Sequence, residues 1–470
     1  MRPHLDRRPS SAARRGPALN SSASTASTAS APGLRRTLKL RHLLLFGIII
    51  IQPTAPMSIY GVVSNAARGH VVTTILIAMV AMLFTAVSYG RMARVYPSAG
   101  SAYTYVGSEL HPVAGYVVGW AMLMDYMLNP IICVIWCSAA AQNVIPQIPY
   151  AAWALAFVIV FTSLNLLGVQ ASSRVNAGLA LGMGIVVVVF MAFAIHYIAV
   201  VAQPAGHTWL QPFYDPATFS TGRVLNGTSI AVLTYIGFDG ISTMSEEVEN
   251  PRRNVMLATV LTCFIIGVLS AIEVYVAQLV WPGRTPFPPS MVDTAYVHVG
   301  MRVGGKFLFQ LLNGTLLVAN LGSGIAAQFG AARLLYGMGR ENALPRRFFG
   351  AVSARSGIPH NNVLLLGLIT LGGAFVLTYA RGAELLNFGA FIAFIGVNAA
   401  ALVHYKFRST EKVRLPALLP LLGMAICTFI WLHLDIDAKL LGASWVAVGL
   451  LIYLFMRRRR ARLDTGAAQA

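Results

Sequence analysis

The chain has 470 residues, of which 56% are hydrophobic and only 11% are charged, and its mean hydropathy is +0.66. An ordinary soluble domain carries roughly 25% charged residues, so the composition excludes a soluble globular protein of this length. The 35 Lys and Arg against 16 Asp and Glu give a formal net charge of +19. Such an excess can indicate a nucleic-acid partner, but only where the basic residues gather on one folded face.

Residues 1–37 have a different composition from the rest of the chain. They contain Arg pairs in a Ser/Ala/Thr-rich run with almost no apolar side chains, which predicts a disordered basic tail. An Arg-rich, Ser-rich and acid-poor run is also typical of an organelle transit peptide, and this alternative stays open. A cleaved secretory signal is not expected, because the apolar stretch from Leu43 exceeds the usual length and further apolar stretches follow.

Apolar stretches of about 20 residues, long enough to cross ~30 Å of hydrocarbon, recur after this tail. We predict twelve transmembrane helices, an even number that puts both termini on the same side. Their ranges are 43–67, 71–91, 112–141, 150–168, 177–201, 226–245, 255–281, 307–333, 362–380, 384–405, 415–433 and 440–456.

Basic residues divide unequally between the two sides of this predicted bundle. If the N-terminus is cytoplasmic, 28 Lys and Arg, including Arg457–Arg460, lie on the inner side and 7 on the outer side. This asymmetry follows the positive-inside rule. The sequence therefore predicts a multi-pass protein of the cytoplasmic (inner) membrane with both termini cytoplasmic. The net charge then indicates orientation, and no nucleic-acid partner is expected.

The four cysteines, Cys133, Cys137, Cys263 and Cys427, all lie within predicted spans. Cys133 and Cys137 share a helix face and could hold a metal, but no His or carboxylate cluster accompanies them. We interpret the four as small buried hydrophobic residues. No disulfide framework, metal or cofactor is expected.

The first and sixth predicted spans contain residues that interrupt a helix. The first contains Pro53 and Pro56, each of which removes a backbone donor, and the sixth contains Gly237 and Gly240 on either side of Asp239. Unwound backbone within a membrane is tolerated where it lines a cavity. Two breaks five spans apart indicate an inverted repeat with a substrate site between them, although simple kinks are the alternative.

Each break exposes backbone groups that suit a charged ligand. The half-helix after a break presents free N–H groups and the positive end of its dipole, which suit a carboxylate. The half-helix before a break presents free C=O groups, which suit an ammonium or another cation. A zwitterionic amino acid would use both ends, whereas an amine would use one.

Three acids, Asp125, Asp239 and Glu273, lie within predicted spans, where a charge costs about 2.5–3.5 kcal/mol on insertion scales. Asp239 is the best placed to carry a proton or to anchor an ammonium. It could instead cap the second half of its span. Asp125 and Glu273 are further candidates for proton coupling, unless they are merely protonated or hydrogen-bonded between helices.

Three motifs carry a family resemblance. They are Tyr96-Pro97-Ser98-Ala99-Gly100-Ser101-Ala102-Tyr103-Thr104-Tyr105 followed by Gly119-Trp120, Gly237-Phe238-Asp239-Gly240 leading to Ser245-Glu246-Glu247, and Ala331-Ala332-Arg333-Leu334-Leu335-Tyr336-Gly337-Met338-Gly339-Arg340. In this order and spacing, the chain resembles the amino acid-polyamine-organocation (APC) superfamily of permeases, and most closely its bacterial putrescine-importer branch. The resemblance covers the chain from about Leu38 to Met456.

The resemblance implies an all-α, LeuT-like fold with a five-plus-five inverted-repeat core and two extra C-terminal helices. The expected divisions are the ten-helix core 38–405, with repeats of about 43–201 and 226–405, helices eleven and twelve over 406–456, and a basic cytoplasmic tail over 457–470. It also implies transport by alternating access.

Substrate contacts are implied at both breaks, with help from spans three and eight. The positions are Ala55, Pro56, Met57, Ser58, Tyr60, Tyr235, Gly237, Phe238, Asp239 and Ser323. Phe238 matches the aromatic residue that covers bound substrate from outside in this family. From the residues alone, it could equally face lipid or serve in packing.

Two positions depart from the family patterns. Ser58 stands where the putrescine-importer pattern has an aspartate, which weakens a diamine assignment because two ammonium groups want two compensating charges. Met183 stands where some permeases have a lysine whose proton acts in place of sodium. Ser323 is the single hydroxyl of Gly322–Gly324, whereas sodium coupling typically needs a pair, so protons are favoured over sodium.

The sequence therefore predicts a secondary active importer of a small amino acid or amine, a putrescine-like polyamine included, that is coupled to protons and works in the lipid bilayer. An amino acid/amine exchanger is the alternative. A non-transporting nutrient sensor usually adds a soluble signalling region, and an enzyme needs a catalytic constellation, which the scattered His196, His404 and His433 do not supply. The oligomeric state is not predicted.

Overall fold

The computed structural model describes residues 38–97, 101–168, 173–201, 209–245, 248–281, 286–340, 344–353, 356–409 and 417–467. The predicted tail 1–37 lies outside this set, as do Gly100 and the acidic pair Glu246 and Glu247. The set contains no named strand, and an isolated bridge pairs Leu38 with Val248.

The first half of the chain forms α1 (Leu40–Ile51), α2 (Ala55–Ala66), α3 (Val71–Val95), α4 (Ser101–Glu109), α5 (Pro112–Val144), α6 (Tyr150–Leu166), α7 (Ser173–Val200), α8 (Thr221–Ala231), the 3₁₀ turn η1 (Val232–Tyr235) and α9 (Gly240–Thr243). The second half forms α10 (Pro251–Val280), the 3₁₀ turn η3 (Val292–Thr294), α11 (Ala295–Arg340), α12 (Arg346–Phe349), α13 (His360–Val376), α14 (Tyr379–Val403), the π-helical turn η4 (His404–Arg408), α15 (Leu418–Leu432) and α16 (Ile436–Ala467).

Eight helical segments are long and apolar enough to cross a membrane, and the bent pair α1–α2 makes up to nine among the described residues. Three further apolar helices, α6, α13 and α15, are shorter, with 17, 17 and 15 residues. The all-α, polytopic fold class is therefore confirmed.

The helix α11 begins earlier than the predicted span 307–333, but the segment that follows its internal kink begins within a few residues of the predicted start. The kink lies at Gly304 and Gly305, and Gly305 has a φ of 60°, a conformation that costs glycine little. The segment before the kink carries Arg302, whose guanidinium lies 5.5 Å from the ring centre of Trp281. Arg302 and Lys306 interrupt the apolar run, which hid the first turns of α11 from the hydropathy pattern.

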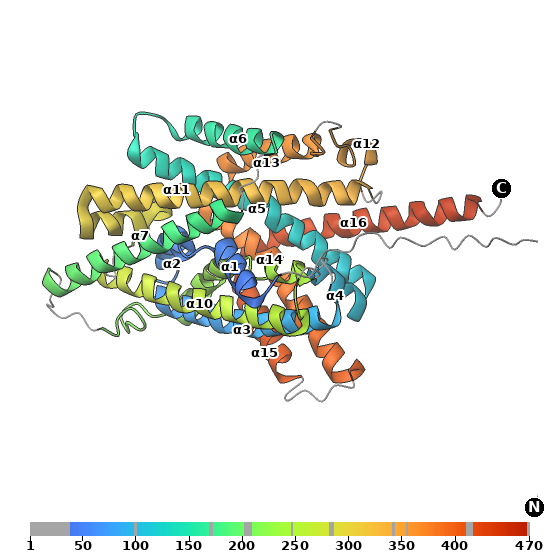
Figure 1. Cartoon of the computed structure of the whole chain (residues 1–470), viewed down its shortest axis with the longest axis horizontal. Helices are drawn as coiled ribbons and strands as arrows, with labels where there is room; N and C mark the ends of the chain where they lie inside the picture. Colours follow the sequence, from blue (N-terminus) through green and yellow to red (C-terminus); the bar gives the residue numbers. More distant parts are fainter. Residues whose placement is uncertain are drawn as a thin grey trace, which may run out of the picture. The chain divides into compact units, whose positions relative to one another are not determined.

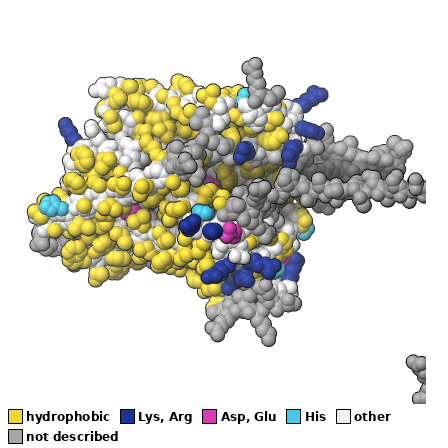
Figure 2. All heavy atoms as spheres, viewed as in Figure 1, with side chains coloured by type: hydrophobic (Ala, Val, Ile, Leu, Met, Phe, Trp, Pro, Cys, Tyr) yellow, Lys and Arg dark blue, Asp and Glu magenta, His cyan; other side chains and the backbone are white. Residues whose placement is uncertain are grey.

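The long helices run side by side, with α10 along α3 and α5 along both α11 and α14 (Figure 1). Hydrophobic side chains cover most of the surface over these helices, as Figure 2 shows. On α7, the side chains of Leu181 and Val188 are each 68% exposed, as expected of a face that contacts lipid rather than water. All four cysteines are free and buried, which confirms their assignment as hydrophobic residues.

Candidate functional site

The predicted interruption of the first span is confirmed. The helix α1 ends at Ile51, α2 begins at Ala55, and the two axes differ by 44°. Between them Gln52 has a φ of 71°, and its side-chain amide donates to the backbone oxygen of Ala319 in α11 at 3.2 Å. Pro53 lacks a backbone donor, so the i→i−4 ladder cannot run through this point.

The first turn of α2 is deeply buried, and the polar groups there make few hydrogen bonds. Thr54 occupies its N-cap position at 1% exposure, but its side chain makes no capping bond and its hydroxyl has no partner among the described residues. One residue into the next turn, the Ser58 hydroxyl accepts a bond from the Asn320 amide of α11 at 3.2 Å. Polar groups from two helices therefore meet at this break.

The sixth predicted span is also interrupted where expected. After α8 the chain tightens into η1, reverses at Gly237, which has a φ of 113°, and resumes as α9 at Gly240. A Cβ on Gly237 would lie 2.4 Å from Cγ2 of Ile50, at the end of α1. The two breaks therefore touch, and a glycine is required where they do.

Asp239 lies within this second break, half-buried at the N-cap position of α9. Its carboxylate faces the backbone amides of Gly237, Gly240 and Asp239 itself, and makes no capping bond to the following turn. Asp125 of α5 lies close enough to Asp239 to interact electrostatically, and so does Tyr126. The structure therefore places two of the three predicted intramembrane acids within electrostatic range of each other.

The side chains of Phe238 and Tyr235 pack around the break. Phe238 is fully buried, with its ring centre 5.5 Å from that of Tyr89 and 5.3 Å from that of Phe394, so the lipid-facing alternative was wrong. The Tyr235 hydroxyl donates to the backbone oxygen of Ile75 at 2.9 Å. Both side chains thus form the wall that separates the break from α3 and α14.

Ser323 on α11 faces α5. Its hydroxyl donates to the Asn129 side-chain oxygen at 3.4 Å, and the Cys133 thiol donates to the same oxygen at 3.3 Å. Met183, which stands where some permeases of the family have a lysine, lies on α7 and is buried, at 6% exposure.

Tyr60 and Glu273 lie together, in a second cluster. The Tyr60 ring contacts those of Phe287 and Tyr296, at 5.9 and 5.5 Å between centres, and the Tyr296 hydroxyl donates to the backbone oxygen of Glu273 at 3.3 Å. The Glu273 side chain is fully buried, and neither carboxyl oxygen has a hydrogen-bond partner within the described part of the chain. Glu273 is thus separate from the Asp125–Asp239 pair.

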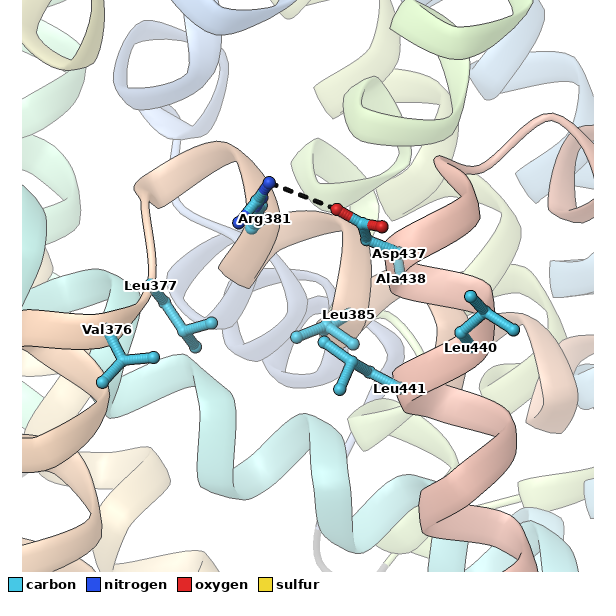
Figure 3. Close-up of a pocket in the computed structure, with 8 residues that line it drawn as sticks. All are labelled: Val376, Leu377, Arg381, Leu385, Asp437, Ala438, Leu440 and Leu441. Carbon is cyan, nitrogen blue, oxygen red and sulfur yellow. Dashed lines mark hydrogen bonds and ion pairs between the residues drawn. The ribbon is translucent and has the colours of Figure 1, made fainter.

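A cavity of about 470 Å³ lies between α2, α8, η3 and α14. Three carboxylates line it, those of Asp293, Glu384 and Asp435, and Arg381 is the cation in its wall. Arg381 also lines a neighbouring apolar cavity of about 340 Å³, where it pairs with Asp437 at 3.2 Å (Figure 3). The lining of the 470 Å³ cavity thus contains three carboxyl groups and one guanidinium, which also pairs with Asp437.

Three functional candidates were missed by the sequence analysis. Asn129 and Asn320 are amides in otherwise apolar stretches, and this polarity could have marked them. Glu384 is the first residue of the predicted span 384–405 and was not among the three predicted intramembrane acids. It is 6% exposed on α14, and the Asn226 amide donates to it at 3.3 Å. No group of three or more potential metal ligands occurs among the residues that the structure describes.

Comparison with known proteins finds permeases and other transporters. The family model for amino acid permeases matches residues 42–457. The chain is 32% identical to the low-affinity putrescine importer PlaP of Escherichia coli (strain K12), covering 90% of this chain and 93% of that protein. It is 27% identical to the branched-chain amino acid permease BcaP of Lactococcus lactis subsp. cremoris (strain MG1363), covering 91% and 96%. It is 24% identical to the methylthioribose transporter of Bacillus subtilis (strain 168), covering 92% and 95%.

Proposed function

Because the chain belongs to the amino acid permease family, we propose that it is a secondary active importer of a small amino acid or amine, putrescine-like polyamines included, working by alternating access. A chain of this family, with this many apolar helices, is a multi-pass membrane protein and a transporter rather than an enzyme. The observation that carries the proposal is the contact between the two broken spans at Ile50 and Gly237, with Asp239 beside it.

The proposed architecture has twelve spans, with α6, α13 and α15 counted as short ones. Its core is a five-plus-five inverted repeat, because the two breaks are five spans apart, and the last two spans lie outside that repeat. We place both termini in the cytoplasm and the protein in the inner membrane, on the strength of the 28 to 7 division of Lys and Arg.

The two breaks suit the two ends of a substrate. We place the ammonium group at Asp239 and Asp125, where two carboxylates lie near each other. A substrate carboxylate would bind at the first turn of α2, near Ala55, Pro56 and Met57, where the Thr54 hydroxyl has no partner in the described structure. The acid-lined cavity supports a cationic cargo, because a cleft lined by one sign of charge concentrates ligands of the opposite sign.

Proton coupling is the proposed energy source. Asp239, with Asp125, is the first candidate, since one of the two carboxyls can take up the proton while the other binds the substrate ammonium. Glu273 is the second, because a buried carboxyl without a hydrogen-bond partner is costly to ionise. It is therefore suited to hold a proton.

The test is uptake by the purified protein in proteoliposomes. We expect radiolabelled putrescine or a small amino acid to accumulate faster under an inward proton gradient, and Asp239→Asn to abolish most of that uptake. Uptake that ignores both the gradient and the substitution would contradict proton coupling through Asp239. Uptake that requires preloaded amine or amino acid would identify an exchanger instead.

A further inference from the structure

A basic patch lies in the connection between α11 and α13, outside both breaks. Arg340 is the last residue of α11, and Arg346 and Arg347 follow it in α12. All three side chains are exposed, and so is Phe348, at 42%. We call Arg340, Arg346, Arg347 and Phe348 the α12 patch. In the view of Figure 2, Lys and Arg side chains gather toward the end of the molecule where α12 lies in Figure 1.

The arginines of the α12 patch have no acidic partner in the described part of the chain. The ion pairs found there join Arg381 to Asp437, and His404 and Arg408 to Glu109. None of the three patch arginines donates a side-chain hydrogen bond to another described residue either. A guanidinium stays charged at any physiological pH. The patch therefore carries three positive charges that no described carboxylate neutralises.

The backbone beneath the α12 patch is fixed to the neighbouring helices. The amide of Asn362, buried in the first turn of α13, donates to the backbone oxygens of Ala332 at 3.1 Å and Phe349 at 3.0 Å. A Cβ on Gly339 would lie 2.5 Å from the backbone nitrogen of Gly350, so the end of α11 and the end of α12 are in close contact. A ligand that fits this arrangement binds without the cost of ordering a loop.

Guanidinium groups next to an exposed aromatic ring suit the headgroup region of a lipid bilayer. Arginine binds phosphate oxygens through two parallel hydrogen bonds, and aromatic side chains are enriched at the interface between membrane and water. Under the proposed orientation, the connection between spans eight and nine is cytoplasmic, and the anionic lipids of that leaflet attract basic segments. A soluble phosphate would use the arginines but would leave Phe348 in water.

We infer that the α12 patch is a binding site for an anionic phospholipid of the inner leaflet. Arg346 and Arg347 bind the phosphate, Arg340 adds to the attraction, and Phe348 enters the interface beside the headgroup. The bound lipid would anchor the end of α11, the helix whose Asn320 amide bonds the Ser58 hydroxyl at the first break. The inference rests on the proposed orientation and not on the proposed transport function.

The test is native mass spectrometry of the full-length protein released from detergent micelles. The protein is titrated with phosphatidylglycerol as the anionic probe and with phosphatidylcholine as the neutral one, and we expect the wild type to bind phosphatidylglycerol more tightly. The double variant Arg346→Gln/Arg347→Gln should bind phosphatidylglycerol about 30-fold more weakly, because two cationic groups near the headgroup are lost. Its affinity for phosphatidylcholine should not change.

Arg252→Gln/Arg253→Gln is the matched control, because it removes two exposed arginines from the first turn of α10, on the same proposed side of the membrane. It should bind phosphatidylglycerol as the wild type does. Equal weakening in the two double variants would overturn the inference, since the lipid would then respond to total charge and not to the α12 patch. Displacement of the lipid by glycerol 3-phosphate at the same concentration would also overturn it, by making the patch a site for a soluble phosphate.

Discussion

The break between α1 and α2 and the break between η1 and α9 differ in what faces their amide groups. At the second break a side chain of the protein is already present, since the Asp239 carboxylate lies against the amides of Gly237 and Gly240. At the first, the Thr54 hydroxyl is buried without a partner in the described structure. One break therefore already holds a carboxyl group of the protein, and the other can accept a carboxylate from a ligand.

This difference separates two kinds of substrate. An amino acid would place its ammonium at the acidic break and its carboxylate at the first turn of α2, and so use both. A diamine would use the carboxylates alone. Variants that damage one break and spare the other can therefore show which kind is transported.

The largest effect is expected from Asp239→Asn. Removing one member of a buried charge pair costs about 2–5 kcal/mol, so we expect the KM for any ammonium-bearing substrate to rise roughly 30-fold or more. The measurement is initial uptake against substrate concentration, with Asp125→Asn as the comparison. A wild-type KM in Asp239→Asn would move the ammonium site away from the second break.

Gly237→Ala should be the next most damaging change. Its φ of 113° and the 2.4 Å approach to Ile50 leave no room for a Cβ, and such strain costs on the order of 1–3 kcal/mol. We expect lowered thermal stability and uptake. The matched control is Gly240→Ala, whose Cβ would make an ordinary 3.5 Å contact with Ile50. Equal losses in both variants would show that the contact between the breaks is not needed.

Thr54→Val tests the first break directly. Valine has a similar shape and lacks the unpaired hydroxyl, so the free energy of unfolding should barely change. If an amino acid carboxylate binds there, its KM should rise by about fivefold, the value of one neutral hydrogen bond of ~1 kcal/mol. The KM for putrescine should not change. Equal changes in the KM for an amino acid and for putrescine would show that the first break does not bind a substrate carboxylate.

The smallest effect is expected from Ser58→Asp. It adds a carboxylate within reach of the Asn320 amide, and we expect the KM for putrescine to fall by about threefold, since exposed or half-exposed ion pairs contribute about 0.2–1 kcal/mol. Ser58→Ala, which loses only the Asn320 bond, is the control. An unchanged or higher putrescine KM would place the second ammonium away from α2.

Both breaks were predictable because their causes are local. Pro53 removes a donor, and Gly237 permits a reversal that other residues resist, so a few consecutive residues are sufficient. The partners of the breaks are not local: Asn320 lies 262 positions from Ser58. Hydropathy and spacing report which stretches are apolar, but they do not report which helices become neighbours.

The burial of an acid near the end of a span also depends on which helices become its neighbours, which the sequence pattern does not report. Asp239 stood out because glycines surround it, whereas Glu384, the first residue of the predicted span 384–405, did not stand out, although its helix begins five residues earlier, at Tyr379. Its hydrogen-bond partner Asn226 comes from α8, which is distant in the chain. That contact could only be found once the helices were placed.

The burial of the four cysteines has a practical consequence. Cys133 is 3% exposed, and Cys137, Cys263 and Cys427 are fully buried. A maleimide added to the folded protein should therefore react slowly with the native thiols and rapidly with a cysteine introduced at an accessible site. The natural sequence can then serve directly as the background for attaching fluorophores or spin labels that follow the opening of the transporter.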